Sequence, residues 1–206
     1  MQKLLEGIEK FRKEDFKAYR ELFKDLKKGQ APHTLFISCS DSRIDSHLIT
    51  ETLPGELFVI RNIANMVPPF RETTEYVATR SAIEYAVIEL GVENIIVCGH
   101  SHCGGCAACL DPSKLPEELV HTKKWLELAH PVRDRVLKEI PEEEPETRAR
   151  VMEQSNVVQQ LKHLVTYPYI QQKVAEGKLA LGGWYYIIET GEIFIYDKDA
   201  GEFVLP

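Results

Sequence analysis

The first 28 residues follow a helical pattern of apolar and charged positions. Leucine, isoleucine, phenylalanine and tyrosine recur every three or four residues from Leu4 to Leu26, among lysines and glutamates, and Gly29 takes the position of a helix C-cap. The pattern predicts an amphipathic helical arm over residues 1–29 with a break near Asp15. In so short a chain the apolar face of this arm has no obvious cover, which favours packing on a partner subunit.

Short apolar runs alternate with helical patterns along the rest of the chain. Runs at 34–38, 57–60 and 94–98 predict buried strands, and a helical pattern from Thr73 to Leu90 separates the last two, ending at Gly91. Strand, helix and strand in this order are typical of a parallel sheet. Further along, the pattern predicts an acidic surface loop at 139–146, a helix at 147–165, and a terminal hairpin of strands 181–188 and 193–196.

The fold class that follows is α/β, with a mostly parallel central sheet flanked by helices. Two hundred and six residues are compatible with one domain, and neither a linker nor an internal repeat divides them. We therefore expect a single domain over 1–206, made of the arm at 1–29 and an α/β core at 30–206.

Composition and charge exclude some classes of partner and indicate where the protein works. Lys and Arg number 25 against 32 Asp and Glu, a net charge of −7, which opposes binding to nucleic acid and to anionic membranes. The most apolar stretch, 180–188, is too short to span a bilayer. No signal-peptide pattern opens the chain, so we expect a cytoplasmic location. The five cysteines are an odd number, and four of them lie between 98 and 109, which favours a metal or thiol function over disulfides.

Two polar loops follow predicted strands and carry the candidate chemistry. Cys39 to Arg43 follow the first strand, and Gly99 to Cys106 follow the third. Loops at the carboxyl ends of parallel strands lie on one edge of the sheet, so these two loops can meet there. Cys39, His100 and Cys103 would supply two thiolates and one imidazole, which Zn²⁺ prefers, and three protein ligands are typical of catalytic zinc. The sequence therefore predicts one Zn²⁺ per chain.

Charge suggests roles for the residues beside these ligands. Two thiolates cancel the charge of Zn²⁺, so a bound water is harder to ionise there than in a three-histidine site. Asp41 is placed to accept a hydrogen bond from metal-bound hydroxide, and Arg43 can keep Asp41 ionised. Gly104 and Gly105 permit close approach of the backbone ahead of a predicted helix at 106–110.

Other interpretations use the same residues. Cys103 and Cys106 have the spacing of a thioredoxin-type redox pair, but that interpretation leaves Cys39 and His100 unexplained. His47 and His102 are candidate proton carriers, although surface histidines are common. A zinc-stabilised assembly subunit with little turnover is a third interpretation, and Asp41 and Arg43 argue against it because structural zinc needs neither.

The paired motifs Cys39-x-Asp41-x-Arg43 and His100-x-x-Cys103 resemble the signature of the β-class carbonic anhydrases, in their plant-like and bacterial branch. The resemblance continues through 54–65, 82–87 and the Gly182 to Trp184 segment, and covers nearly the whole chain. The chain departs from the family pattern at Ala78 and Arg80, where a glycine and a small residue are expected. These two departures bear on the local backbone and the subunit contact and do not involve the metal ligands.

The resemblance implies a function and a residue set. The function is zinc-dependent reversible hydration of carbon dioxide to bicarbonate and a proton, in a homodimer or a higher even homo-oligomer; hydrolysis of carbonyl sulfide or carbon disulfide is the alternative on this scaffold. It assigns Cys39, His100 and Cys103 to zinc, and Asp41 and Arg43 to catalysis. The substrate pocket would be lined by Gln30, Phe58, Ile63, Tyr85 and Gly104, with Phe58 and Tyr85 coming from the neighbouring subunit.

The resemblance also bears on regulation. In one branch of the family the residue at the position of Asp41 binds zinc and shuts the site, and bicarbonate favours that state from a pocket that uses a tryptophan. This chain has Phe36 at the tryptophan position, and a phenyl ring has no N–H to donate to an anion. We therefore expect an open site with Asp41 paired to Arg43, and simple dependence on bicarbonate.

Overall fold

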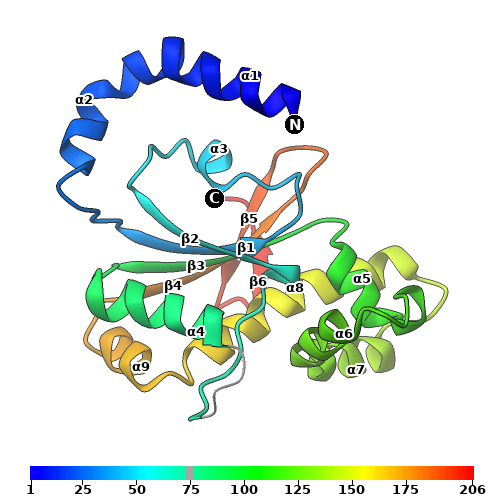
Figure 1. Cartoon of the computed structure of the whole chain (residues 1–206). Helices are drawn as coiled ribbons and strands as arrows, with labels where there is room; N and C mark the ends of the chain where they lie inside the picture. The colour runs from blue at the N-terminus through cyan, green and yellow to red at the C-terminus, as the bar shows by residue number, and fades with distance from the viewer. Residues whose placement is uncertain (73–76) are drawn as a thin grey trace. The chain divides into compact units, whose positions relative to one another are not determined.

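A six-stranded sheet forms the centre of residues 32–206, in the order β2-β1-β3-β4-β5-β6 (Figure 1). The computed structural model describes residues 1–72 and 77–206. The first four strands along this order run parallel, whereas β5 pairs antiparallel with both β4 and β6, so the predicted mostly parallel α/β sheet is confirmed. The strands are β1 (Thr34–Cys39), β2 (Leu57–Asn62), β3 (Asn94–His100), β4 (Ala180–Tyr186), β5 (Ile193–Asp197) and β6 (Glu202–Val204).

Helices flank this sheet as the pattern predicted. They are α3 (Ser46–Thr50), α4 (Val77–Glu84), α5 (Gly104–Leu110), α6 (Val120–Leu126), α7 (His130–Glu139), α8 (Pro145–Leu164) and α9 (Pro168–Ala175). A π-helical turn, Tyr85–Glu89, continues α4, and Gly91 follows with a φ of 67°. Thr73, the predicted start of this helix, lies outside the described residues.

Two apolar clusters fill the interior. In the larger one, Leu35 and Ile37 of β1 pack with Ile83 of α4, Val157 of α8 and Ile170 of α9. In Figure 1 these three helices lie on the same side of the sheet. The second cluster gathers residues of α5, α6, α7 and α8, and it includes Cys39 and Cys103. The candidate metal ligands are therefore part of a packed core.

The strand register brings the candidate loops to one edge of the sheet. Ser38 of β1 pairs with Cys98 of β3, and Cys39 pairs with Asn62 of β2, so these strands end side by side. The predicted loop starts need a small correction, because Cys39 and His100 are the last residues of their strands. Main-chain pairing extends this far since neighbouring strands still offer partners: Cys39 is paired with Asn62, and His100 with Tyr186 of β4.

The N-terminal segment, Met1–Ala31, is a separate compact unit from Pro32–Pro206. It contains α1 (Gln2–Lys10), a π-helical turn (Phe11–Asp15) and α2 (Phe16–Leu26), so the irregularity predicted near Asp15 is present. Phe16 contacts Phe11 and Phe23, with ring centroids 5.9 and 5.4 Å apart. A single domain over 1–206 stays a prediction.

Among the helices of the described residues, none has both the length and the apolar character that crossing a bilayer requires.

Candidate metal centre and active site

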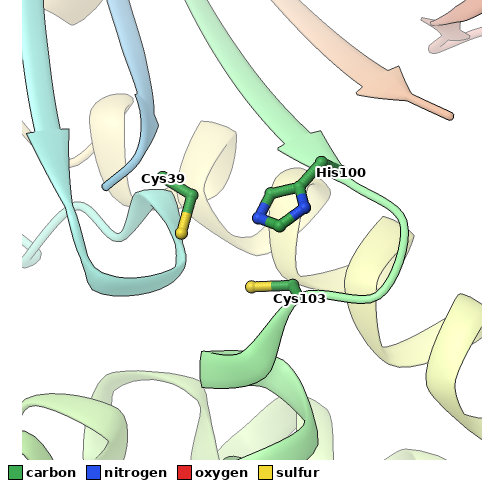
Figure 2. Close-up of side chains that lie close together, drawn as sticks. All are labelled: Cys39, His100 and Cys103. Carbon is green, nitrogen blue, oxygen red and sulfur yellow. The ribbon is translucent and has the colours of Figure 1, made fainter. Parts of the chain in front are cut away.

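Three side chains from separate elements converge at the carboxyl edge of the sheet. Cys39 ends β1, His100 ends β3, and Cys103 is the N-cap residue of α5. Figure 2 shows their side chains directed toward one another, and their ligand atoms all lie within 4.8 Å of one another. They are buried, with 5%, 1% and 1% of their surfaces exposed. The structure thus brings together the three residues predicted to bind zinc.

The ring of His100 is oriented so that one nitrogen is free for a metal. Nδ1 lies 2.9 Å from the carbonyl oxygen of Ser101, and because a carbonyl only accepts, Nδ1 carries the proton. Nε2 then has its lone pair available, and it is buried with no hydrogen-bond partner in the described part of the chain. A buried polar atom without a partner costs free energy unless something binds it. A metal ion fits that requirement, and the Nδ1 contact fixes the ring.

The two thiols also need a cation. A hydrogen bond to the Cys103 thiol, together with burial, raises the pKa of Cys39 to about 12. A hydrogen bond to Cys106 and burial both raise the pKa of Cys103. Two neighbouring thiols therefore stay protonated at neutral pH unless a cation replaces their protons. Two sulfur donors and one imidazole nitrogen fit a tetrahedral Zn²⁺ with one open position.

Asp41 lies beside this centre and is paired with Arg43, as expected. Nε of Arg43 donates to Oδ1 at 2.9 Å, Nη2 donates to Oδ2 at 2.7 Å, and the Arg43 amide adds a bond of 3.0 Å to Oδ1. These bonds hold the pKa of Asp41 well below its usual range. Oδ2 is 3.9 Å from Nε2 of His100, so an ionised carboxylate faces the metal centre.

Arginines tie the two loops together. Nη2 of Arg43 also donates to the carbonyl oxygen of His102, at 3.0 Å, which joins the Cys39 loop to the His100 loop. Arg61 of β2 donates to the carbonyl oxygens of Cys39, at 3.1 Å, and Asp41, at 2.6 Å. Sequence reasoning gave Arg61 no role. Arg61 lies in the 54–65 segment that resembles the family, which was the one indication of its importance. Its acceptors are main-chain atoms, and a sequence pattern does not show which side chain will bind them.

The turn after β2 places Ile63 at the same edge. Ala64 and Asn65 have φ of 59° and 48°, a left-handed conformation that non-glycine residues adopt at a cost. Three side chains hold the turn: Asn62 bonds the amide and carbonyl of Met66, Asn156 of α8 donates to the Ala64 carbonyl, and Trp125 of α6 donates to the Ile63 carbonyl. The turn packs on α5 at Gly105, where an added Cβ would lie 2.9 Å from the Ala64 Cβ.

The other residues expected to line the pocket have different surroundings. Gly104 is the first residue of α5, directly after Cys103, and an added Cβ there meets nothing within 4 Å, so close packing explains Gly105 and not Gly104. Phe58 and Tyr85 pack on each other, with ring centroids 6.0 Å apart. Gln30 belongs to the separate N-terminal unit. Substrate-binding roles for all these residues remain predictions.

The two departures from the family pattern lie on α4. Ala78 is exposed, while Arg80 donates to the carbonyl oxygens of Arg71, at 3.0 Å, and Pro69, at 3.2 Å. Arg80 thereby holds the main chain at Pro69 and Arg71, and it lies on a different element from the metal ligands.

The cysteines outside the ligand set are all thiols. Cys98, Cys106 and Cys109 are buried and free, and none of the five forms a disulfide. Burial raises the pKa of Cys98 to about 12, which makes it unreactive and agrees with its expected place in the core.

Comparison with known proteins agrees with this site. The carbonic anhydrase family pattern matches residues 34–193. A carbonic anhydrase of Synechocystis sp. is 43% identical over 206 residues, which is 100% of this chain and 74% of that protein. One from Helicobacter pylori strain J99 is 38% identical over 198 residues, covering 94% of this chain and 89% of the relative.

Solved structures show which class of carbonic anhydrase this chain resembles. The β-carbonic anhydrase CcaA matches with a TM-score of 0.93 and 42% identity, over 100% of this chain and 99% of that one. The Coccomyxa β-carbonic anhydrase, solved with acetazolamide, matches with a TM-score of 0.82 and 30% identity, over 98% and 90% of the two chains. This chain belongs to the β class of the carbonic anhydrase family. It is accordingly an enzyme of the lyase type that hydrates carbon dioxide.

Proposed function

We propose that this chain interconverts carbon dioxide and bicarbonate at a single Zn²⁺ held by Cys39, His100 and Cys103. One observation carries the proposal: three buried donors, one of them a nitrogen without a partner, converge beside an ionised carboxylate. Structural zinc sites are closed by four protein ligands, whereas this group offers three. When bound, Zn²⁺ supplies the Lewis acidity that lets water lose a proton near neutral pH.

The ligands set the charge of the site. Two thiolates balance a divalent cation and the imidazole is neutral, so Asp41 and Arg43 decide the electrostatics around the open position. The carboxylate of Asp41 is ionised and can only accept hydrogen bonds. It would accept one from the attacking water oxygen and so direct the lone pair of that oxygen toward carbon dioxide. Arg43 and Arg61 hold the loop that carries Asp41.

The remaining pocket residues would bind the substrate. Carbon dioxide is small and apolar, and Ile63, Phe58 and Tyr85 are suited to surround it, with Phe58 and Tyr85 supplied by a neighbouring subunit. The side chain of Gln30 and the amide of Gly104 would donate hydrogen bonds to the oxygens of the developing bicarbonate.

We also propose a homodimer or a higher even homo-oligomer with a cytoplasmic location. Apolar side chains along α1 and at the start of the π-helical turn after it are strongly exposed: Leu4 by 67%, Leu5 by 55%, Ile8 by 62% and Phe11 by 45%. A β-carbonic anhydrase of Sordaria macrospora, 32% identical, is tetrameric. Five free thiols are compatible with the reducing cytoplasm.

Assays of the zinc-loaded protein with carbon dioxide and carbonyl sulfide, side by side, test the function. We expect rapid, zinc-dependent hydration of carbon dioxide and little hydrolysis of carbonyl sulfide. Faster turnover of carbonyl sulfide than of carbon dioxide would show that the chain is the alternative, a hydrolase of carbonyl sulfide or carbon disulfide. Absence of turnover on both, at full zinc occupancy, would favour an assembly subunit instead.

A further inference from the structure

A buried acid lies behind the metal centre. Glu153 of α8 is 4% exposed, and its Oε1 accepts a hydrogen bond of 2.8 Å from the backbone amide of Cys103. Its Oε2 accepts one of 2.6 Å from the hydroxyl of Tyr185, on β4. No salt bridge of the described residues involves Glu153. The carboxylate thus connects a candidate metal ligand to the sheet through two neutral donors.

The burial of this carboxylate has a cost that needs an explanation. Taking a carboxyl group out of water is unfavourable unless its hydrogen bonds compensate, and an apolar side chain fills a helix position at lower cost. Met152 and Val157, its neighbours on α8, are apolar and fully buried. A role in packing alone therefore does not account for an acid at this position.

The loop between the ligands explains what the acid can do. His102 has a φ of 56°, so the chain turns sharply between His100 and Cys103 through a conformation that is costly without support. One end of this loop is tied to β4 because the Ser101 amide donates to the Tyr186 carbonyl at 2.9 Å. The other end has no main-chain partner on β4, and Glu153 supplies the link from the Cys103 amide to Tyr185.

We propose that Glu153 is a positioning residue for the metal ligand Cys103, with Tyr185 holding the carboxylate in place. Fixing the Cys103 amide fixes its peptide plane, and with it the direction in which the Cys103 thiol leaves the backbone. The proposal rests on the proposed function, because it requires Cys103 to be a ligand.

The surroundings of Glu153 make it suitable for substitution. It lies with Tyr185, Ser101 and His102 on the wall of a hollow of about 320 Å³. Water can enter this hollow when the side chain is shortened, and a water molecule can satisfy the Cys103 amide without holding it in one direction. The chain can then fold while the ligand loses its fixed orientation.

Metal release from the full-length, zinc-loaded chain into a chelator tests the proposal. We expect Glu153→Ala to release zinc about 10- to 100-fold faster than the unsubstituted chain. Glu153→Gln keeps an oxygen acceptor for the Cys103 amide and should release zinc at close to the unsubstituted rate. Tyr185→Phe keeps the carboxylate but removes its anchor, so its rate should fall between those of Glu153→Gln and Glu153→Ala.

Gln160 provides a matched control. It is fully buried on the same helix, and its side-chain oxygen accepts a hydrogen bond of 2.8 Å from the Val67 amide. Val67 is not a metal ligand. Gln160→Ala should lower thermal stability with no comparable effect on zinc release. Substitution of Co²⁺ for zinc adds a second readout, because the thiolate-to-metal absorption should shift in Glu153→Ala and not in Gln160→Ala.

Two results would overturn the proposal, and a third would remove the proposed function on which it rests. Equal zinc release from Glu153→Ala and Gln160→Ala would leave Glu153 with a structural role only. If Glu153→Ala does not fold, Tyr185→Phe decides the question. A Tyr185→Phe chain that releases zinc no faster than the Gln160→Ala chain would also leave Glu153 with a structural role only. Failure of the unsubstituted chain to bind zinc at all would instead remove the proposed function, and that result is distinguishable because it needs no variant.

Discussion

Cys39 and Cys103 hold their thiols against each other in the core, and this contact determines how the chain takes up a metal. The pKa of Cys39 is raised to about 12 without a metal, and that of Cys103 is raised as well, so both are protonated at neutral pH. Metal binding must therefore displace two protons, and acid opposes it. We expect the apparent zinc affinity to rise about 100-fold for each pH unit through the neutral range, because two protons leave. Chelator competition at several pH values measures this slope; a tenfold slope would show that one thiol is already ionised.

Loss of any one donor should leave the site unable to hold zinc. Cys39→Ser, His100→Ala and Cys103→Ser should each lose both metal and activity, since two remaining ligands bind zinc too weakly. Elemental analysis of the purified chains decides the matter. Cys106→Ser is the matched control, because Cys106 is a buried thiol outside the ligand group, and it should keep its zinc. Full occupancy in all three ligand variants would contradict the assignment.

Asp41 should matter for turnover and not for metal content. An asparagine at this position keeps the size of the side chain but cannot form the ionic pair with Arg43 or present a carboxylate to the attacking water. Asp41→Asn should keep its zinc and lose turnover on the order of 100-fold. Asp45→Asn is the control, because Asp45 caps α3 through the amides of His47 and Leu48 and asparagine caps equally well. Turnover near the unsubstituted value in Asp41→Asn would reduce Asp41 to a structural partner.

At the scale of elements, α5 packs closely on the turn after β2. An alanine Cβ at Gly105 would lie 2.9 Å from the Ala64 Cβ and 3.0 Å from Cγ2 of Ile63, and Ala64 has no flexible side chain that could move aside. Gly105→Ala should therefore destabilise the fold by about 1–3 kcal/mol, with a lower Tm. Gly104→Ala, one position earlier with open space around it, should leave the Tm unchanged or slightly higher. Equal Tm values for the two variants would exclude this packing constraint.

The elements that the sequence predicted share a strong local signal. β1, β2 and β3 are continuous apolar runs between polar turns, and a buried parallel strand leaves that pattern. Weak signals hid other elements: β6 has only three residues, Glu202–Val204, and α3 has five. The helices α6 and α7 went unnoticed because each buries few side chains, so their apolar periodicity is faint.

The site shows the same division between local and long-range information. The ligands and Asp41 could be predicted because their chemistry is written in short motifs at the ends of strands. Glu153 could not, because α8 follows an acidic loop and a glutamate there is indistinguishable from a solvated one. Asn156 lies three residues after Glu153 and Gln160 four residues after Asn156, which places all three on one helix face, but the burial of that face is known only from the fold.

For the whole molecule, the exposed apolar face of α1 predicts self-association. Light scattering of the full chain should show at least a dimer, and removal of residues 1–28 should weaken or abolish it. Ile8→Asp tests the same face in an otherwise intact chain, because Ile8 is 62% exposed. Lys10→Ser, on the opposite side of α1, should leave the mass of the oligomer unchanged in light scattering. A fully active monomer would contradict the prediction.

The link from Cys103 through Glu153 to Tyr185 also orders events during synthesis. The three ligands lie within the first 103 residues, whereas α8 and β4, which carry Glu153 and Tyr185, are synthesised later. A nascent chain that stops before β4 therefore lacks the link that holds Cys103, and its thiols are exposed to oxidation and to other metals. Secure loading with zinc then requires synthesis to pass β4, so the metal content reports whether a chain contains both α8 and β4.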